Sequence, residues 1–327
     1  MSYRVLIVGC GQLGGRHAQA LAGLDLCREI VVVDPVAQSL VWGQARVREV
    51  GDADPMIRWQ WKDTLASVEE NFDLVVIATQ AAGRVALIKQ IAAKFGAKTF
   101  LIEKIVAQSI ADYEDLIAFA HAQNLKIWVN CKSRAYQVHK RIKSLLPVKE
   151  PVIYMASGGN HGLANNGVHH ADLFMFFDES PVMESFGSHI DPVVHSSKRI
   201  GNMDLSGSLC GATTKGSQFM LSYAAGHMAP DQVNIVSSQG CFTIDHLGRS
   251  AYECLPEKDW KWQPMAWQED ILVSFMTRAF ARDIFTHQRC DLPDLEQCYP
   301  AHEFILKQLQ PAFRKLWKAD ADHCPVT

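Results

Sequence analysis

The sequence predicts an α/β protein in which a doubly wound parallel sheet is followed by an α+β region with a mixed or antiparallel sheet. In the first part, short runs of Val, Ile and Leu are bounded by Gly, Asp or polar residues, and helical patterns separate these runs. Runs without polar alternation suit strands that are buried on both faces, as in a parallel sheet. Alternation of strands and helices with short connections is typical of doubly wound domains.

The elements of the first part follow from these runs in order. Strands are expected at residues 4–8, 30–33, 74–78 and 100–102, and a weaker one near 57–61. Helices are expected at residues 16–24, 84–95 and 110–123, where apolar residues recur at intervals of three and four.

After the apolar run at residues 126–129, the alternation of strand and helix patterns ends and strand-like segments predominate. Strand-like segments at 152–157, 206–212, 217–224 and 232–237 are separated by glycines and serines, and one helix is expected at 168–177. This pattern is typical of a mixed or antiparallel sheet. Helical patterns at 268–286 and 300–318 close the chain. We therefore predict two domains, residues 1–125 and residues 126–327.

Composition excludes several classes of function. The chain has 327 residues, of which 48% are hydrophobic, so it can bury a large core and form about two domains. The net charge is -3 and the basic residues are scattered, which disfavours nucleic acid and anionic membranes as partners. The apolar runs are shorter than the ~20 residues of a membrane-spanning helix, and the first one does not resemble a signal peptide. Nine cysteines without regular spacing predict reduced thiols in the cytoplasm.

A glycine-rich segment, Gly9-Cys10-Gly11-Gln12-Leu13-Gly14, joins the first expected strand to a helical pattern. Its glycines suit a tight turn, a close approach of pyrophosphate and close packing of helix on strand. The helix start favours phosphate anions. Such glycines can also serve only a turn, but Asp34 ends the second strand, twenty residues after Gly14, where a carboxylate would accept hydrogen bonds from ribose hydroxyls. The context predicts dinucleotide binding, with NAD favoured over NADP, although nearby Arg or Ser residues can override this preference.

Two opposite charges, Glu103 and Lys104, end the fifth expected strand. Ligands of doubly wound sheets bind outside the carboxyl ends of the strands. A lysine there can donate a hydrogen bond to a substrate oxygen, or exchange a proton with it if burial lowers its pKa. Glu103 could hold the ammonium in position. A solvated ion pair at a strand end is the alternative reading of these two residues alone.

Further segments carry a family resemblance when they are taken together with the glycine loop. They are Gly9 to His17, Ala78-Thr79, Glu103-Lys104, Val129 to Arg134, Gly167-Val168-His169-His170-Ala171-Asp172, and Leu292-Pro293-Asp294. In this order they resemble the opening motif, the Ala-Thr-Pro and Glu-Lys-Pro motifs, the entry into the second domain, the Gly-x-His-x-x-Asp motif and the C-terminal return of the Gfo/Idh/MocA family. This family includes glucose-fructose oxidoreductase and inositol dehydrogenase.

The resemblance implies a Rossmann NAD(P)-binding domain and a second domain that binds the substrate and forms oligomers through an open sheet. It implies that Lys104 and His169 are catalytic, that Asn165 assists them, and that these residues together with Arg134 bind the substrate. The residues that it implies for cofactor binding are Gly9, Gly11, Gln12, Leu13, Gly14, Asp34, Ala78, Thr79 and Glu103. A homodimer or homotetramer is expected.

The sequence departs from the family at several positions. Gln80 and Ile105 stand where the family has proline, Arg84 replaces a histidine, and Lys132 replaces an asparagine. The carboxylate that often lies four residues before the histidine is Asn165, which can orient a substrate hydroxyl but cannot take a proton. His161, His169, His170 and Asp172 could suit a metal ion, but close third and fourth ligands are not evident, so no metal is predicted. Trp260, Trp262 and Trp267 could stack on a carbohydrate, although aromatic clusters more often belong to a core or an interface.

These observations predict a cytoplasmic NAD-dependent oxidoreductase. It would transfer a hydride between nicotinamide and a carbinol carbon of a sugar, a polyol or a nucleotide-linked sugar. Two alternatives stay open. One is an enzyme that uses tightly bound NAD for elimination or epimerisation of a sugar without net redox change. The other is a non-catalytic dinucleotide sensor, which the exchange at Asn165 motivates.

Overall fold

The chain folds into two compact units. The computed structural model describes residues 2–68, 71–197, 202–267, 269–317 and 323–327. The first unit comprises Met1–Ala107, Asp112–Asn130 and Asp270–Leu295, and the second comprises Gln108–Ala111, Cys131–Glu269 and Glu296–Thr327.

The division differs from the boundary expected at residue 125. Strand β6 (Lys126–Val129) extends the first unit because it pairs with β5 (Thr99–Ile102). The segment 270–295 also returns to this unit. The N–H of Val129 donates to the carbonyl of Pro293 at 2.9 Å, and Trp128 forms a β-bridge with Asp294. The boundary between the two units therefore depends on backbone hydrogen bonds between segments that are distant in the sequence. The local pattern of apolar residues carries no information about these bonds.

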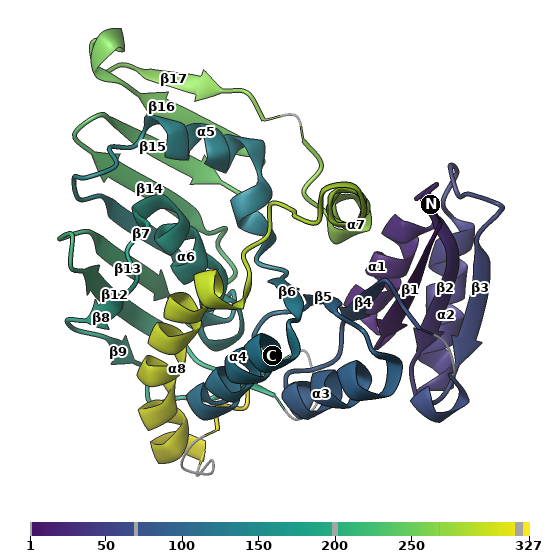
Figure 1. Cartoon of the computed structure of the whole chain (residues 1–327). Helices are drawn as coiled ribbons and strands as arrows, with labels where there is room; N and C mark the ends of the chain where they lie inside the picture. Colours follow the sequence, from purple (N-terminus) through teal and green to yellow (C-terminus); the bar gives the residue numbers. More distant parts are fainter. Residues whose placement is uncertain (1, 69–70, 198–201, 268, 318–322) are drawn as a thin grey trace. The chain divides into compact units, whose positions relative to one another are not determined.

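The first unit contains a six-stranded parallel sheet in the order β3-β2-β1-β4-β5-β6 (Figure 1). Its remaining strands are β1 (Tyr3–Val8), β2 (Cys27–Val33), β3 (Arg58–Lys62) and β4 (Leu74–Ile77). This order confirms the predicted doubly wound sheet and places its topological switch point between β1 and β4. The four residues of β4 are all buried, which explains why their run carries no polar alternation.

Among the described residues, five α-helices belong largely to this unit: α1 (Gln12–Leu21), α2 (Ala37–Arg48), α3 (Arg84–Phe95), α4 (Ile110–Gln123) and α7 (Val273–His287). The expected helix at 268–286 corresponds to α7, and residue 268 lies outside the described residues. Helix α2 was not predicted from the sequence. Its one buried residue is Gly43, where a β-carbon would lie 2.3 Å from Cys10 Sγ, so the helix packs through backbone and leaves no apolar stripe in the sequence.

The second unit contains a nine-stranded mixed sheet with the main order β17-β16-β15-β14-β7-β13-β12-β8, and β9 also pairs with β12. Its strands are β7 (Ile153–Gly158), β8 (Met183–Ser185), β9 (His189–Ile190), β12 (Gly207–Thr213), β13 (Gln218–Tyr223), β14 (Gln232–Ser237), β15 (Gly240–Asp245), β16 (Ser250–Cys254) and β17 (Trp262–Met265). Strands β7 and β13 are parallel and the other pairs are antiparallel. The predicted mixed sheet is confirmed. A short pair, β10 (His195–Ser196) and β11 (Met203–Asp204), lies apart from it.

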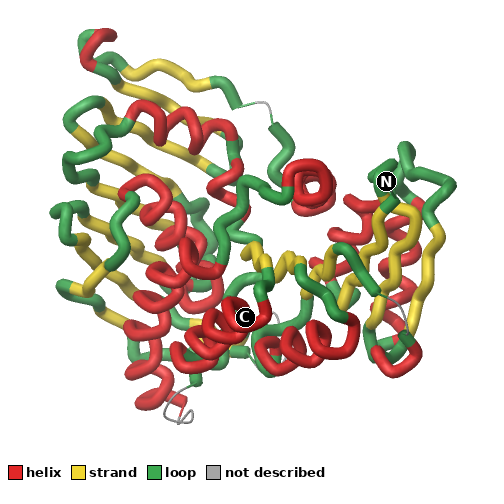
Figure 2. The backbone as a smooth tube through the Cα atoms, viewed as in Figure 1, coloured by secondary structure: helices red, strands yellow, loops and turns green. Residues whose placement is uncertain are grey.

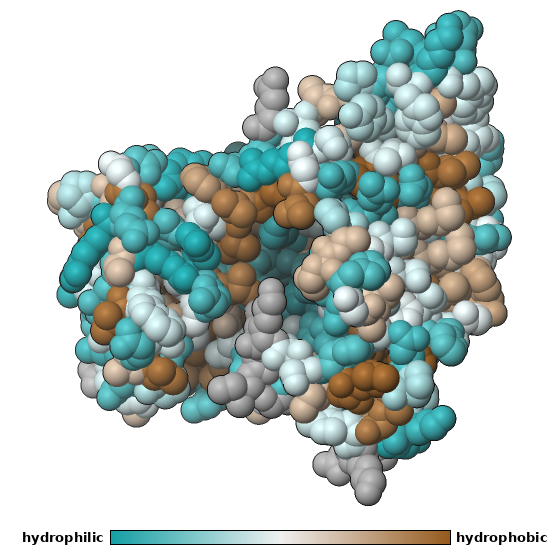
Figure 3. All heavy atoms as spheres, turned by 180° about the vertical axis from the view of Figure 1, so that it is seen from behind, coloured by the Kyte–Doolittle hydropathy of each residue, from teal (hydrophilic) through white to brown (hydrophobic). Residues whose placement is uncertain are grey.

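Helices α5 (Gln137–Leu145), α6 (Leu163–Asp178) and α8 (Leu295–Trp317) cover one face of this sheet (Figure 2). A β-carbon on Gly167 of α6 would meet Leu221 of β13, and one on Gly211 of β12 would meet Phe304 of α8. In β12, buried and partly exposed residues alternate, so only this face is buried. On the opposite face, Met155, Met220 and Val236 are partly exposed. Figure 3 shows the molecule from behind, where hydrophobic residues lie among hydrophilic ones on the surface.

Two helices are longer than the sequence predicted. Helix α6 begins five residues before the expected start at 168, because Asp204 Oδ1 accepts a hydrogen bond from the N–H of Ala164 at 2.9 Å. This cap comes from β11, forty residues away, and not from the local sequence. Helix α8 begins at Leu295 instead of residue 300. Its expected end at residue 318 lies outside the described residues.

Two histidines contact each other in the second unit: His139, which is buried in α5, and His246, which follows β15 and is partly exposed. His139 Nδ1 contacts the carbonyl of Ser133 at 2.7 Å, and His139 Nε2 lies 3.1 Å from His246 Nε2. Burial, together with the nearby charge of His170, lowers the pKa of His246 to about 4, and burial lowers the pKa of His139 well below its usual value. Both rings are therefore neutral near pH 7.

This pair makes the stability of the protein depend on pH. The pKa of His246 falls from 6.5 when unfolded to about 4 when folded, so the unfolded chain binds more protons between these values and stability falls as the pH falls through this window. At pH 5 we expect His246 to cost up to about 2 kcal/mol of the free energy of unfolding. Urea unfolding at pH 7.5 and 5.0 measures this loss, and His246→Gln should lose less. An equal loss in both proteins would contradict the assignment.

Candidate active site

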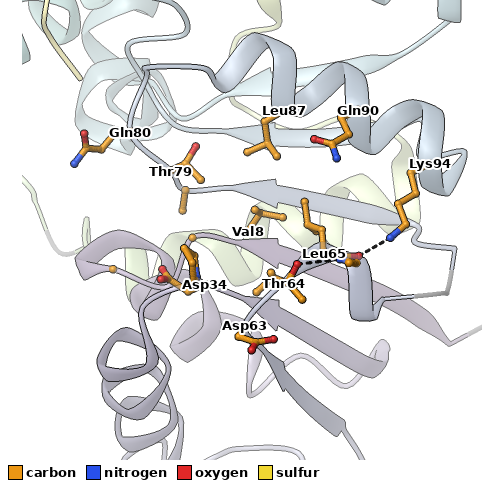
Figure 4. A pocket seen from close by; sticks show the side chains of 16 residues that line it. Val8, Asp34, Asp63, Thr64, Leu65, Thr79, Gln80, Leu87, Gln90 and Lys94 are labelled. Carbon is orange, nitrogen blue, oxygen red and sulfur yellow. Dashed lines mark hydrogen bonds between the residues drawn. The ribbon is translucent and has the colours of Figure 1, made fainter.

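A cavity of about 800 Å³ lies in the first unit, outside the carboxyl ends of β1, β2 and β4 (Figure 4). This volume is in the range of cofactor pockets. Of the nine residues predicted to bind the cofactor, five line it: Gly9, Gly11, Asp34, Ala78 and Thr79. Leu87 and Gln90 from α3 form one wall, while Thr64 and Leu65, which follow β3, lie across the cavity.

The three glycines of the loop have different physical roles. Gly9 has a φ of +88°, and a β-carbon there would lie 2.9 Å from the main chain of Ala78. A β-carbon on Gly14 would lie 1.8 Å from the carbonyl oxygen of Gly9, so α1 can pack on β1 only without it. A β-carbon on Gly11 would meet nothing within 4 Å. Gly9 and Gly14 are thus required by packing, whereas Gly11 keeps space open before the N-terminus of α1, where pyrophosphate can approach.

Asp34 is held rigidly at the end of β2. Its Oδ2 accepts a hydrogen bond from the N–H of Cys10 at 2.6 Å, and its Oδ1 accepts one from the N–H of Val36 at 2.8 Å. A carboxylate oxygen can accept more than one hydrogen bond, so both can still accept from ribose hydroxyls. Asp63, which follows β3, lines the same cavity and was not singled out from the sequence. Its position after a parallel strand is the signal that could have found it.

Glu103 anchors the end of β5 in a buried network. Its Oε1 accepts a hydrogen bond from Asn130 Nδ2 at 2.7 Å and lies 2.9 Å from His17 Nε2. His17 Nδ1 in turn lies 2.9 Å from Thr277 Oγ1 of α7. Burial raises the pKa of Glu103, but His17, Asn130 and the charge of Lys104 outweigh burial and hold it below its usual value. The carboxylate therefore stays ionised, and it fastens β5 to α1 and β6.

Lys104 directly follows this anchor and is 7% exposed. The buried side chain of Arg84 contacts the main chain on both sides of it. Arg84 Nη1 donates to the carbonyl of Glu103 at 2.6 Å and to that of Ile105, and Arg84 Nη2 donates to that of Thr79. Sequence reasoning noticed Arg84 only as a departure from the family. These contacts place it at the edge of the sheet where Lys104 lies.

In the second unit, helix α6 carries His169 and His170, which have different environments. His170 is buried, and its Nδ1 and Nε2 each lie 2.8 Å from a tyrosine hydroxyl, those of Tyr154 and Tyr223. His170 Nε2 also lies 3.2 Å from Asp231, whose pKa is lowered to about 2 because the hydrogen bond and charge of His170 outweigh burial. His169 is partly exposed. His169, the histidine that the Gly-x-His-x-x-Asp resemblance implies for catalysis, is thus more exposed than His170.

Arg134 forms a two-pronged ion pair with Asp172 of α6. Arg134 Nε and Nη2 lie 2.8 and 2.6 Å from the two carboxylate oxygens, and Nη2 also donates to the carbonyl of Gln297 at 3.0 Å. Burial opposes the charge of Arg134, but Asp172 outweighs burial and raises its pKa. These contacts indicate a structural role. Substrate binding by Arg134 stays a prediction.

One group of three potential metal ligands occurs among the described residues. It consists of Cys131, Asp172 and Cys298, whose ligand atoms lie within 4.8 Å of one another. Arg134 already occupies both oxygens of Asp172, and burial keeps the pKa of Cys298 far above its usual value. The arrangement therefore suits an ion pair beside the neutral thiol of Cys298 better than a cation.

The amide of Asn165 binds backbone at both ends. Its Nδ2 donates to the carbonyl of Met203 at 2.8 Å, and its Oδ1 accepts from the N–H of Thr327 at 3.0 Å. The segment 324–327 is nearly buried and also binds Gln108, whose Nε2 donates to the carbonyl of Val326 at 3.0 Å. No local pattern predicted that this segment would reach α6. Its contacts give Asn165 a structural role beside the predicted one.

A matched pair of substitutions separates the two roles of the glycines. We expect Gly14→Ala to lower the free energy of unfolding by at least about 2 kcal/mol, because the new methyl group overlaps a main-chain oxygen. Gly11→Ala should leave stability unchanged, since its φ of -66° suits alanine, but it should weaken NADH binding by at least about tenfold. Urea unfolding and NADH fluorescence titration measure these quantities. Unchanged NADH affinity in Gly11→Ala would contradict the assignment of the phosphate site.

No family model and no curated protein matches the sequence. Solved structures do match the fold. UDP-N-acetylglucosamine 3-dehydrogenase of Acidithiobacillus ferrooxidans superposes with a TM-score of 0.74 at 15% identity, over 97% of this chain and 99% of that chain. An oxidoreductase of Agrobacterium radiobacter, in complex with NAD+, L-tartaric acid and magnesium, gives 0.73 at 13% identity, over 93% and 94%.

A third likeness is to the 3-ketoreductase KijD10 of Actinomadura kijaniata in complex with NADP. Its TM-score is 0.70 at 17% identity, over 93% of this chain and 96% of that chain. Nearly the full length of each protein is covered, so both units and their connections are shared. The chain has the two-unit fold of these oxidoreductases.

Proposed function

We propose that the protein is an NAD-dependent oxidoreductase of the Gfo/Idh/MocA family. Its reaction is hydride transfer between nicotinamide and a carbinol carbon of a sugar, a polyol or a nucleotide-linked sugar. One observation carries this proposal: a cavity lined by the glycine loop and Asp34 lies on the same sheet edge as a buried, anchored lysine, Lys104. If the glycines served only to form a turn between β1 and α1, neither the cavity nor the buried lysine beside it would be expected.

The residues of the cavity fit a dinucleotide. Gly11 leaves open space before α1 for the pyrophosphate, and Asp34 presents fixed oxygens to the adenosine ribose. Two carboxylates, Asp34 and Asp63, line the cavity, and both repel a 2′-phosphate. NAD is therefore the proposed cofactor in preference to NADP. When bound, its nicotinamide accepts the hydride or returns it.

Lys104 handles the reacting oxygen in this proposal. In the direction of oxidation, Lys104 or His169 would take the hydroxyl proton, and the bound cofactor would supply the acceptor for the hydride of the carbinol carbon. In reduction, the same group donates the proton to the developing alkoxide. Asn165 cannot take a proton, so the proton route consists of Lys104 and His169. Asn165 and Arg134 support α6 through the contacts with Thr327 and Asp172.

The named activities of the similar structures support a sugar-like substrate. They are a dehydrogenase of UDP-N-acetylglucosamine and a 3-ketoreductase, and a variant of the latter was solved with TDP-benzene and NADP. Among the described residues, no helix is long and apolar enough to cross a membrane. All nine cysteines are free thiols, which supports the proposed cytoplasmic location.

We also propose a homodimer that forms through the open face of the second sheet. Met155 and Met220 are paired in the register of β7 and β13, and Val236 lies across from Ile153, so apolar residues form adjoining rows on this face. A second copy of the chain would cover both rows. Sedimentation equilibrium at micromolar concentration should give twice the chain mass, and Met155→Glu should give the monomer. A wild-type monomer at these concentrations would contradict the proposal.

The role of Lys104 is tested with a panel of free and nucleotide-linked sugars, each offered with NAD and with NADP. We expect turnover with at least one substrate and a higher kcat/KM with NAD. Lys104→Met should lower kcat by about 10²- to 10⁴-fold, because proton transfer to the oxygen is lost, while NADH affinity is retained. Absorbance of reduced nicotinamide measures the rates. Equal kcat in both proteins would remove Lys104 from the mechanism, and NADH binding without any turnover would favour the sensor.

A further inference from the structure

Arg84 is a buried charge at the carboxyl edge of the first sheet. It is the first residue of α3 and is 1% exposed. Its guanidinium donates to three carbonyl oxygens, those of Thr79, Glu103 and Ile105. The last two belong to the residues on either side of Lys104. One side chain therefore holds the ends of the neighbouring strands β4 and β5 together.

Burying the charge of Arg84 costs free energy that an apolar side chain of the same size would not cost. Removing a guanidinium from water is unfavourable unless acceptors replace the water, whereas an apolar side chain fills the same volume without this penalty. A guanidinium offers donors in a rigid planar fork, with fixed directions. Nη1 donates to the main chain on both sides of Lys104, and Nη2 donates to the carbonyl of Thr79. The rigid guanidinium therefore fixes the main chain around Lys104 relative to Thr79.

We propose that Arg84 is the positioning residue of the Lys104 loop, defined here as residues 103–105. By holding this loop against Thr79, which lines the cofactor cavity, Arg84 sets the place of the Lys104 ammonium relative to that cavity. The inference rests on the proposed function only in that Lys104 handles the reacting oxygen. A displacement of about 1 Å at a reacting group can slow a reaction about 10²-fold, so loss of the fork should act on the chemical step.

A purely structural role predicts something different. In that case, substitution of Arg84 would lower stability, and the surviving folded protein would turn over normally. Arg84→Lys is the decisive variant, because it keeps the positive charge but replaces the fork by a single donor group. Arg278→Ala is the matched control. Arg278 also donates to a main-chain oxygen, that of Ala20 at 3.0 Å, but this oxygen belongs to α1.

The first measurement is the kinetics of the folded enzyme with a substrate found by the panel. We expect Arg84→Lys to lower kcat about 10- to 100-fold, with NADH affinity within about twofold of wild type. Deuterium at the carbinol carbon should give a larger isotope effect on kcat in this variant, because hydride transfer becomes slower than product release. Arg278→Ala should keep both values of the wild type even where it lowers the unfolding temperature.

Chemical rescue distinguishes the loss of the positioning contacts from poor folding of the variant. Arg84→Ala leaves a space beside three carbonyl oxygens, and millimolar guanidinium ion should bind there and restore at least part of kcat. Urea of the same concentration, which has no charge, should restore less. If kcat of Arg84→Lys equals that of wild type, or if every loss of rate follows the loss of folded protein without rescue, the proposal is overturned.

A readout without catalysis keeps this proposal separate from the proposed function. Reductive methylation of Lys104, followed by peptide mass spectrometry, reports its accessibility. We expect faster labelling of Lys104 in Arg84→Ala than in wild type or Arg278→Ala, and slower labelling again when guanidinium is added. If the wild type shows no turnover but the labelling changes in this way, Arg84 still positions the loop and only the proposed function fails. Equal labelling in all proteins would overturn the positioning role.

Discussion

The close contact between the glycine loop and the end of β4 is the constraint on which the first unit depends. The main chain of Gly9 passes so near Ala78 that a β-carbon would lie 2.9 Å from it, and Gly14 passes still nearer to the carbonyl of Gly9. This contact brings the N-terminus of α1 to the switch point between β1 and β4. The cavity lies beside Gly11, where a β-carbon would meet nothing within 4 Å. Asp34 then reaches its edge, fixed by the N–H groups of Cys10 and Val36.

Buried charges organise local structure in both units, and each has a specific set of partners. Glu103 is held by His17 and Asn130, and Arg84 by three main-chain oxygens. In the second unit, the guanidinium of Arg134 meets the carboxylate of Asp172 with two hydrogen bonds. A buried charge without hydrogen-bond partners costs far more free energy than a paired one. Each of these side chains is therefore held to the positions where its partners lie. The network therefore fixes loops that apolar packing alone would leave less well defined.

Each unit contains some of the residues proposed to act in the reaction. The first unit contains the cavity, the carboxylates that line it and Lys104. The second unit contains His169, on a helix whose start is capped by Asp204 and whose Asn165 is bonded to the segment 324–327. The same helix buries His170 between two tyrosines, whereas its neighbour His169 is partly exposed.

The sequence by itself determined the doubly wound sheet, the mixed second sheet and several residues that line the cavity of the first unit. Periodicity and glycine spacing are local, and they report burial on two faces, a tight turn and a carboxylate at a strand end. Gly9, Gly11 and Asp34 were predicted in this way, whereas Ala78 and Thr79 were implied by the family resemblance, and all five line one cavity.

Only the tertiary structure decided the domain boundary at Asn130, the early start of α6 and the partners of Glu103, Arg134 and Asn165. These features depend on hydrogen bonds between segments that are distant in the chain, such as Val129 with Pro293. Helix α2 escaped prediction for a related reason, since its contact is made by the backbone at Gly43. A buried polar contact or a close backbone approach has no periodicity, because its energy depends on the three-dimensional position of its partner.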